Sequence, residues 1–232
     1  MSAATTEKTP SIFWVYFFGV FTALLGAFLG FAYLASFSAQ AFSSEAEYTA
    51  SLEKTEEPSP ASKPGDAYYI KGGILASGSW EPKRAQLATP GPQSVSLRAE
   101  EINAWMAARF RSASPSGEGG GEGIMIVPGV PNVAFTDEGV MYLNVPAEIS
   151  AYGARGDFMI TAQCSVSEGG LEFHTVRVRS ADVPLPNLLG AKLMDVLSQG
   201  YESTEDYQII SDAFARADSI MLEENSLVVQ LP

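Results

Sequence analysis

The chain has 232 residues, enough for one membrane segment followed by one domain of ordinary size. Its formal net charge of -13 argues against nucleic acid as a partner, because an acidic surface repels the phosphate backbone. The chain contains one cysteine, Cys164, so no disulfide can form within it, and the alternating apolar run around this residue predicts a buried, unreactive thiol.

An uncharged apolar stretch comes first in chain order. No charged side chain occurs from Ile12 to Leu34, and about 20 such residues suffice for a helix to cross the hydrocarbon core of a bilayer. We therefore expect a cytoplasmic tail over residues 1–10 and a single transmembrane helix over residues 11–35. Lys8 precedes the stretch and acidic residues follow it, which favours the cytoplasmic (inner) membrane, with the N-terminus inside and the remaining chain outside.

The residues Ala39-Gln40-Ala41 have the spacing of a signal-peptidase site, so secretion after cleavage following Ala41 is the alternative. A signal peptide has an apolar core of about 7–15 residues behind a clearly basic start. Here the apolar stretch is longer, and the single Lys8 is offset by Glu7. These features favour a retained anchor.

Small residues mark one side of the predicted transmembrane helix, at Gly19, Ala23, Gly26 and Gly30. Such residues let another transmembrane helix approach closely, so this face predicts packing against a partner helix or a second copy of the chain. The alternative is that Gly and Ala are simply common in transmembrane helices.

The stretch that follows is predicted to be a stalk and a linker. Phe37, Ala41, Tyr48 and Leu52 recur at helical spacing, which predicts that the helix continues beyond the membrane. The segment "EEPSPASKPG" then favours a linker, because its prolines and final glycine end a regular helix. We assign residues 36–65 to a helical stalk and Pro-rich acidic linker, and residues 66–232 to an extracytoplasmic domain.

The domain is predicted to be α+β: an antiparallel meander sheet packed with two or three amphipathic helices. A helix is expected over residues 96–110, where Ile102, Trp105, Met106 and Phe110 form an apolar stripe. Alternating runs separated by short turns then predict successive antiparallel strands, over residues 124–127, 133–136, 140–152, 157–166 and 171–179. Helices are expected over residues 187–200 and 204–217, and two closing strands over 219–231.

Residues that could carry chemistry are scarce. One histidine, His174, and one cysteine cannot form a Cys/His zinc set, and no nucleophile motif accompanies His174. The acidic turns at residues 137–139 and 223–225 lack the alternating oxygen ligands of a calcium loop. The sequence therefore predicts a protein that is not an enzyme, with no catalytic residue, metal or cofactor.

From residue 95 to 231, the order of features resembles small bacterial membrane-anchored domains of the tubular lipid-binding (TULIP) type. The segments that carry the resemblance are "VSLRAEEINAWMAARF", the meander, "VRVRSADVPLPNLLGAKLMDVL" and "SIMLEENSLVVQL", and the "PLP" before an amphipathic helix is the most distinctive. The resemblance implies a curved sheet wrapped on helices, with an apolar groove for acyl chains.

Two hypotheses for the function follow. In the first, the outer domain binds an apolar ligand, with membrane lipid as the expected partner, in a groove lined by Ile102, Trp105, Met106, Leu189, Leu193 and Leu197. These residues are equally suited to forming the core of any α+β domain. In the second, the chain is a structural or assembly subunit of a larger membrane complex, held there by packing of its transmembrane helix.

Overall fold

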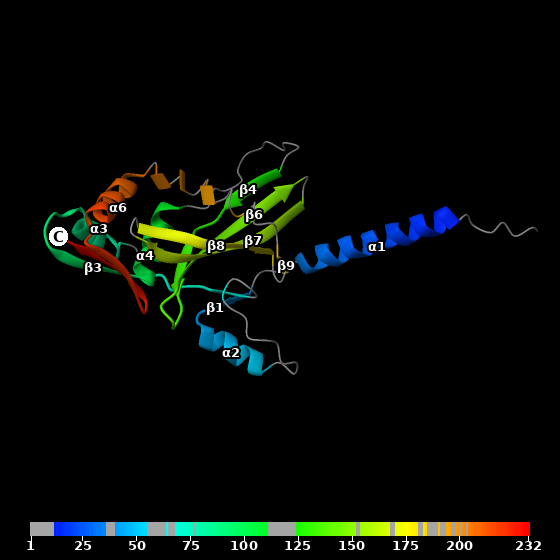
Figure 1. The fold of residues 1–232 in the computed structure, drawn as a ribbon, viewed down its shortest axis with the longest axis horizontal. Coiled ribbons are helices and arrows are strands. Elements are labelled where there is room, and N and C mark those ends of the chain that lie inside the picture. Colours follow the sequence, from blue (N-terminus) through cyan, green and yellow to red (C-terminus); the bar gives the residue numbers. More distant parts are fainter. Residues whose placement is uncertain are drawn as a thin grey trace, which may run out of the picture.

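The structure is a computed structural model in which one long helix projects from a domain of curved sheet and helices (Figure 1). It describes residues 12–35, 40–54, 64, 68–76, 78–110, 124–151, 154–167, 170–180, 183–184, 190, 194–195, 198–199, 201–202 and 204–232. Of the helix expected over residues 187–200, most lies outside these residues.

Helix α1 covers Ile12–Ala35 and is the one helix among the described residues that is long and apolar enough to cross a membrane. Its segment Phe13–Gly30 has a mean hydropathy of 1.8, and none of that segment is buried against the rest of the chain. Large apolar side chains such as Phe13, Tyr16 and Leu24 are exposed. The length and composition expected for an N-terminal apolar helix are thus confirmed.

The predicted continuous stalk is wrong. Strand β1 (Gln40–Phe42) interrupts it, and a separate helix α2 (Glu45–Glu53) follows. The helix restarts because the Ser44 hydroxyl accepts a hydrogen bond from the Glu47 N–H at 3.2 Å, while the Ser43 N–H and hydroxyl donate to the Glu47 carboxylate.

The apolar side chains of this region contact the domain. Strand β1 pairs in parallel with β2 (Tyr68–Ile70), and the Lys71 N–H donates to the Phe42 carbonyl at 2.8 Å. The rings of Tyr48 and Tyr68 stack at 3.7 Å between centroids. The helical spacing of Tyr48 and Leu52 therefore reflects packing of a short helix on the domain.

The predicted antiparallel meander is confirmed. Its strands are β4 (Ile124–Pro128), β5 (Asn132–Phe135), β6 (Met141–Ala151), β7 (Ala154–Ser167), β8 (Gly170–Ser180) and β9 (Val183–Pro184). The order is β4-β6-β7-β8-β9, and β5 pairs with the other half of β6. Its alternating apolar residues form one core cluster, which includes Val133, Met141, Leu143, Val145, Ile160 and Val178.

A second, three-stranded antiparallel sheet has the order β10-β11-β3. Strands β10 (Ser219–Glu223) and β11 (Ser226–Leu231) form the expected closing hairpin, and β11 also pairs with β3 (Gln93–Arg98). Helices α3 (Glu81–Ala88) and α6 (Glu205–Arg216) contact each other, and their buried residues Leu87 and Ala213 join Val95 and Val229 of the sheet in a second core cluster.

Helix α4 covers Ala99–Arg109, so the first residues of the helix expected over 96–110 belong to β3 instead. The chain turns from strand to helix where the Glu101 carboxylate accepts the Arg98 N–H at 2.9 Å. The buried side chain of Asn103 fixes α4 to the meander, because it accepts the Val133 N–H at 2.6 Å and donates to the Val133 carbonyl at 2.8 Å. Its amide also donates to the Gly73 carbonyl at 2.9 Å.

Candidate ligand-binding pocket

A pocket of about 580 Å³ lies where the meander, α4, α6 and the second sheet meet. This volume falls within the range of about 300–1,000 Å³ that is typical of small-molecule sites. The wall is mainly apolar: α4, the meander and α6 supply Ile102, Trp105, Met106, Val133, Met141, Leu143, Ile210 and Phe214. The pocket is thus lined mainly by apolar side chains from helices and from both sheets.

The predicted groove residues divide into two groups. Ile102, Trp105 and Met106 line the pocket, and Ile102 and Met106 also pack against the core of the meander. Leu189, Leu193 and Leu197 lie outside the described residues. The same α4 residues therefore serve both as core and as pocket wall.

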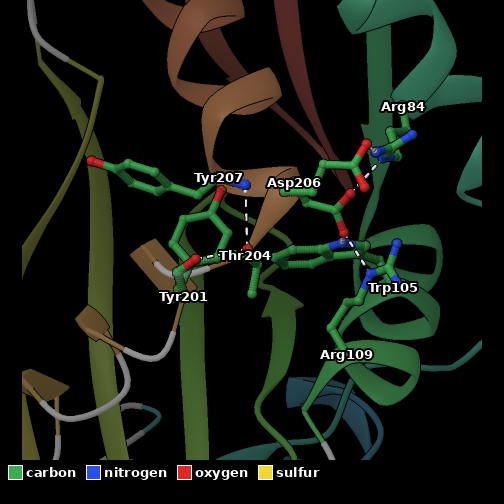
Figure 2. Close-up of polar contacts among 8 residues, drawn as sticks. Arg84, Trp105, Arg109, Tyr201, Thr204, Asp206 and Tyr207 are labelled. Carbon is green, nitrogen blue, oxygen red and sulfur yellow. Dashed lines mark hydrogen bonds and ion pairs between the residues drawn. The ribbon is translucent and has the colours of Figure 1, made fainter.

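One of the lining residues, Asp206, is a buried carboxylate, and Figure 2 shows its contacts. Its residue is 1% exposed, and it lies in the first turn of α6. Its two oxygens accept hydrogen bonds from the side chains of Arg84 (Nε), Arg109 (Nε, 2.5 Å) and Trp105 (Nε1, 2.9 Å). Asp206 therefore ties α6 to α3 and α4.

The protonation of Asp206 follows from these contacts. Burial alone would raise the pKa of this carboxyl, but the hydrogen bonds from Trp105, Arg109 and Arg84 outweigh burial and hold the pKa below its ordinary value. The carboxylate is therefore ionised at neutral pH. Arg84 also pairs through Nη2 with the exposed Glu205 carboxylate at 2.9 Å.

Aromatic rings form the wall beside Asp206 (Figure 2). The ring of Tyr201 packs edge-on against Trp105 at 5.6 Å and against Tyr207 at 5.1 Å between centroids. Thr204 caps α6 and positions two of these residues, because its hydroxyl accepts the Tyr207 N–H at 3.3 Å and donates to the Tyr201 carbonyl at 2.6 Å. Burial raises the pKa of the Tyr201 phenol, so this group stays neutral.

Trp80 connects the carboxylate cluster with the start of α3. The Arg109 guanidinium lies over its ring, 5.0 Å from the centroid, which is cation–π geometry. Trp80 also lines the pocket. Arg109 therefore has an aromatic partner as well as Asp206, and its side chain is fixed from two sides.

Sequence reasoning missed the Asp206 cluster. The acidic pair Glu205-Asp206 stands in the first turn of α6, where the helix dipole favours negative charge, so by its position it indicates only a favourable helix start. Arg84 lies 122 residues from Asp206 in the chain, and no local pattern connects them. Only the fold brings these groups together.

Two other residues singled out from the sequence belong to strands of the meander. His174 belongs to β8, and Cys164 is buried in the meander as predicted, where burial raises the pKa of its thiol to about 12. Within the described part of the chain, no three His, Cys, Asp or Glu side chains gather as a metal site would require. In α1, a Cβ added at Gly19, Gly26 or Gly30 would meet nothing within 4 Å, and Ala23 is exposed on the same helix.

Comparison with known proteins adds no relative: no protein-family model matches the chain, and no curated protein matches it significantly.

Proposed function

We propose that this chain is a non-enzymatic, membrane-anchored binding protein, and that its pocket holds an apolar ligand, namely a lipid. The observation that carries the proposal is the pocket of about 580 Å³ between the meander and helices α4 and α6, with its mainly apolar wall. Pockets of this size and lining suit ligands that bury most of their surface among hydrophobic side chains. The resemblance to TULIP-type domains implies the same ligand class.

The proposed anchor is α1, because its exposed apolar side chains would be costly in water and are suited to a bilayer. With Lys8 before the helix and acidic residues after it, we place the N-terminus in the cytoplasm and the domain outside the inner membrane. Secretion after cleavage following Ala41 remains the alternative, and N-terminal sequencing of the mature protein would reveal it as a chain that starts at Phe42.

The proposed ligand can be tested by native mass spectrometry of the full chain, purified in a neutral detergent. Lipid bound along α1 would give the same mass as lipid in the pocket, so a matched pair of variants is needed. Ser211 and Asp212 are neighbouring exposed residues of α6, but only Ser211 lines the pocket. Tryptophan at position 211 would fill space at the pocket, whereas tryptophan at position 212 would not.

We expect wild type and Asp212→Trp to retain copurifying lipid and Ser211→Trp to lose most of it. Circular dichroism of both variants would establish that they fold equally well. Equal lipid retention by the two variants would contradict the proposed pocket ligand.

The second candidate function is a structural or assembly subunit held by packing of α1. It is favoured by the open face at Gly19, Gly26 and Gly30, which no described part of the chain covers. Small residues of this kind permit close approach of another transmembrane helix. The double variant Gly26→Ile with Gly30→Ile should release a crosslinked partner, and a protein that is always found alone would refute this function.

A further inference from the structure

The charged side chains among the described pocket-lining residues already have hydrogen-bond partners. Among the described lining residues they are Arg84, Glu101 and Asp206. Arg84 is held by Asp206 and Glu205, and both oxygens of Asp206 accept hydrogen bonds. Glu101 accepts the Arg98 N–H at 2.9 Å, at the start of α4. Arg84, the one cation of the three, is therefore not free to neutralise an anionic ligand.

An anionic ligand would disturb this arrangement. Arg84 is the one cation in the described lining, and to pair with a ligand carboxylate or phosphate it would have to loosen its contact with Asp206. Asp206 would then be a buried charge that has lost part of its compensation, which is strongly unfavourable. In addition, Glu101, Glu205 and Asp206 outnumber the cations Arg84 and Arg109 here, so the local field opposes a further negative charge.

Uncharged groups supply further polarity in the described lining. They are the hydroxyls of Ser198, Tyr201, Tyr207 and Ser211 and the indole N–H of Trp80. Hydroxyls donate and accept hydrogen bonds without a charge, and the Tyr201 phenol stays protonated because burial raises its pKa. Such groups can satisfy an alcohol or ester but cannot neutralise a carboxylate.

We propose that the pocket takes an uncharged amphiphile: a long apolar chain that carries a neutral hydroxyl or ester head, rather than a free fatty acid or a phospholipid. The apolar wall at Ile102, Met106 and Phe214 contacts the acyl chain of the ligand, and the hydroxyl groups of the pocket form hydrogen bonds with its head group. This inference rests on the proposed function, since it specifies the ligand of the same pocket.

Two probes with the same tail test the inference: 1-monooleoylglycerol, which is neutral, and oleate, which carries a carboxylate. Each is titrated at pH 9 into the full chain in a neutral detergent, and the bound fraction is read by native mass spectrometry. Subtracting the signal of Ser211→Trp removes association with α1 and the micelle, and Asp212→Trp serves as the matched control. We expect oleate to bind the pocket at least about tenfold more weakly, equivalent to about 1.4 kcal/mol.

Glu205→Gln adds a test of the pairing argument. Glu205 is exposed and pairs with Arg84, so replacing it with glutamine removes the negative charge of this ion pair without opening the core. The ratio of oleate to monooleoylglycerol binding should rise about two- to fivefold, as expected for loss of one exposed ion pair. A ratio that does not rise would overturn the pairing argument.

The remaining outcomes separate the two proposals. Pocket-dependent binding of oleate that equals or exceeds that of monooleoylglycerol would overturn the inference and leave the proposed function standing. If neither lipid distinguishes the wild type from Ser211→Trp, the proposed function itself fails, and the inference fails with it.

Discussion

Replacing Asp206 with asparagine should destabilise the domain more than any other change of one polar side chain at the pocket. The substitution keeps the shape but removes the charge, so the guanidinium groups of Arg84 and Arg109 lose their shared anion. Breaking a buried charge network by removing one partner typically costs about 3–5 kcal/mol. Because the two arginine side chains are 28% and 40% exposed, water recovers part of the loss, and we expect about 2–4 kcal/mol.

Urea unfolding of the full chain in neutral detergent, followed by near-UV circular dichroism, measures this change. With a slope of about 2 kcal/mol/M, the midpoint should fall by about 1–2 M at an unchanged slope. Asp212→Asn is the matched control, because Asp212 is exposed on the same helix, and its midpoint should move by less than about 0.25 M, or 0.5 kcal/mol. If both variants unfold at the same urea concentration, the Asp206 cluster does not hold the three helices together.

Three further predictions concern the same domain. Acid should destabilise the wild type more than Asp206→Asn, because folding lowers the pKa of the Asp206 carboxyl. The stabilisation by this carboxylate is complete above about pH 4 and is lost as the pH falls through the folded pKa. Urea midpoints of both proteins between pH 5 and pH 2 would measure the difference. Gly72→Ala should unfold at a much lower temperature than Gly73→Ala, because a Cβ at Gly72 would overlap the carbonyl oxygen of Val133. A Cβ at Gly73 would meet only the flexible side chain of Glu100, at 3.2 Å. Equal melting temperatures of the two variants would refute this prediction. Cys164 should resist iodoacetamide at pH 8 and react once urea unfolds the chain, because burial raises the pKa of the thiol to about 12; rapid alkylation of the folded protein would contradict its burial.

Local patterns made the meander and α4 predictable. Alternating apolar residues with short turns between them specify consecutive antiparallel strands, and β6, β7 and β8 follow that pattern. The apolar stripe with Ile102 and Met106 likewise specified α4, and Ile102, Trp105 and Met106 line the pocket. These features depend on neighbours in the chain, so the sequence displays them directly.

Helix α3 and the stalk show where local patterns fail. Helix α3 reads "EPKRAQLA", and only Leu87 in it is buried, so its apolar stripe was too short to recognise, although Pro82 near its start was a signal. The helical spacing of Tyr48 and Leu52 was real, but it could not indicate that β1 would pair with β2 and break the stalk. The spacing of apolar residues indicates whether a segment is a helix or a strand, but not which other segment it packs against.

The pocket depends on contacts between distant segments. Strand β3 pairs with β11 from the other end of the domain sequence, and Asp206 gathers Arg84, Arg109 and Trp105 from 97 to 122 residues away. No periodic pattern of apolar residues in the sequence predicts such long-range contacts. The sequence could therefore propose apolar wall residues, but not the paired charges that line the same pocket.

The short connection between α1 and the domain constrains how a ligand would reach the pocket. Strand β1 begins at Gln40, five residues after α1 ends at Ala35, a span of at most about 18 Å for an extended chain. Helix α1 also contacts β9 at one end of the meander, whereas α3, α4 and α6 lie toward the other end (Figure 1). Under the proposed function, the end of the sheet near β9 stays close to the bilayer and the pocket stands away from it. A lipid would then leave the membrane before it binds. A neutral lipid carries no headgroup charge that the protein would have to compensate in this step. This agrees with a pocket whose only described cation is already paired.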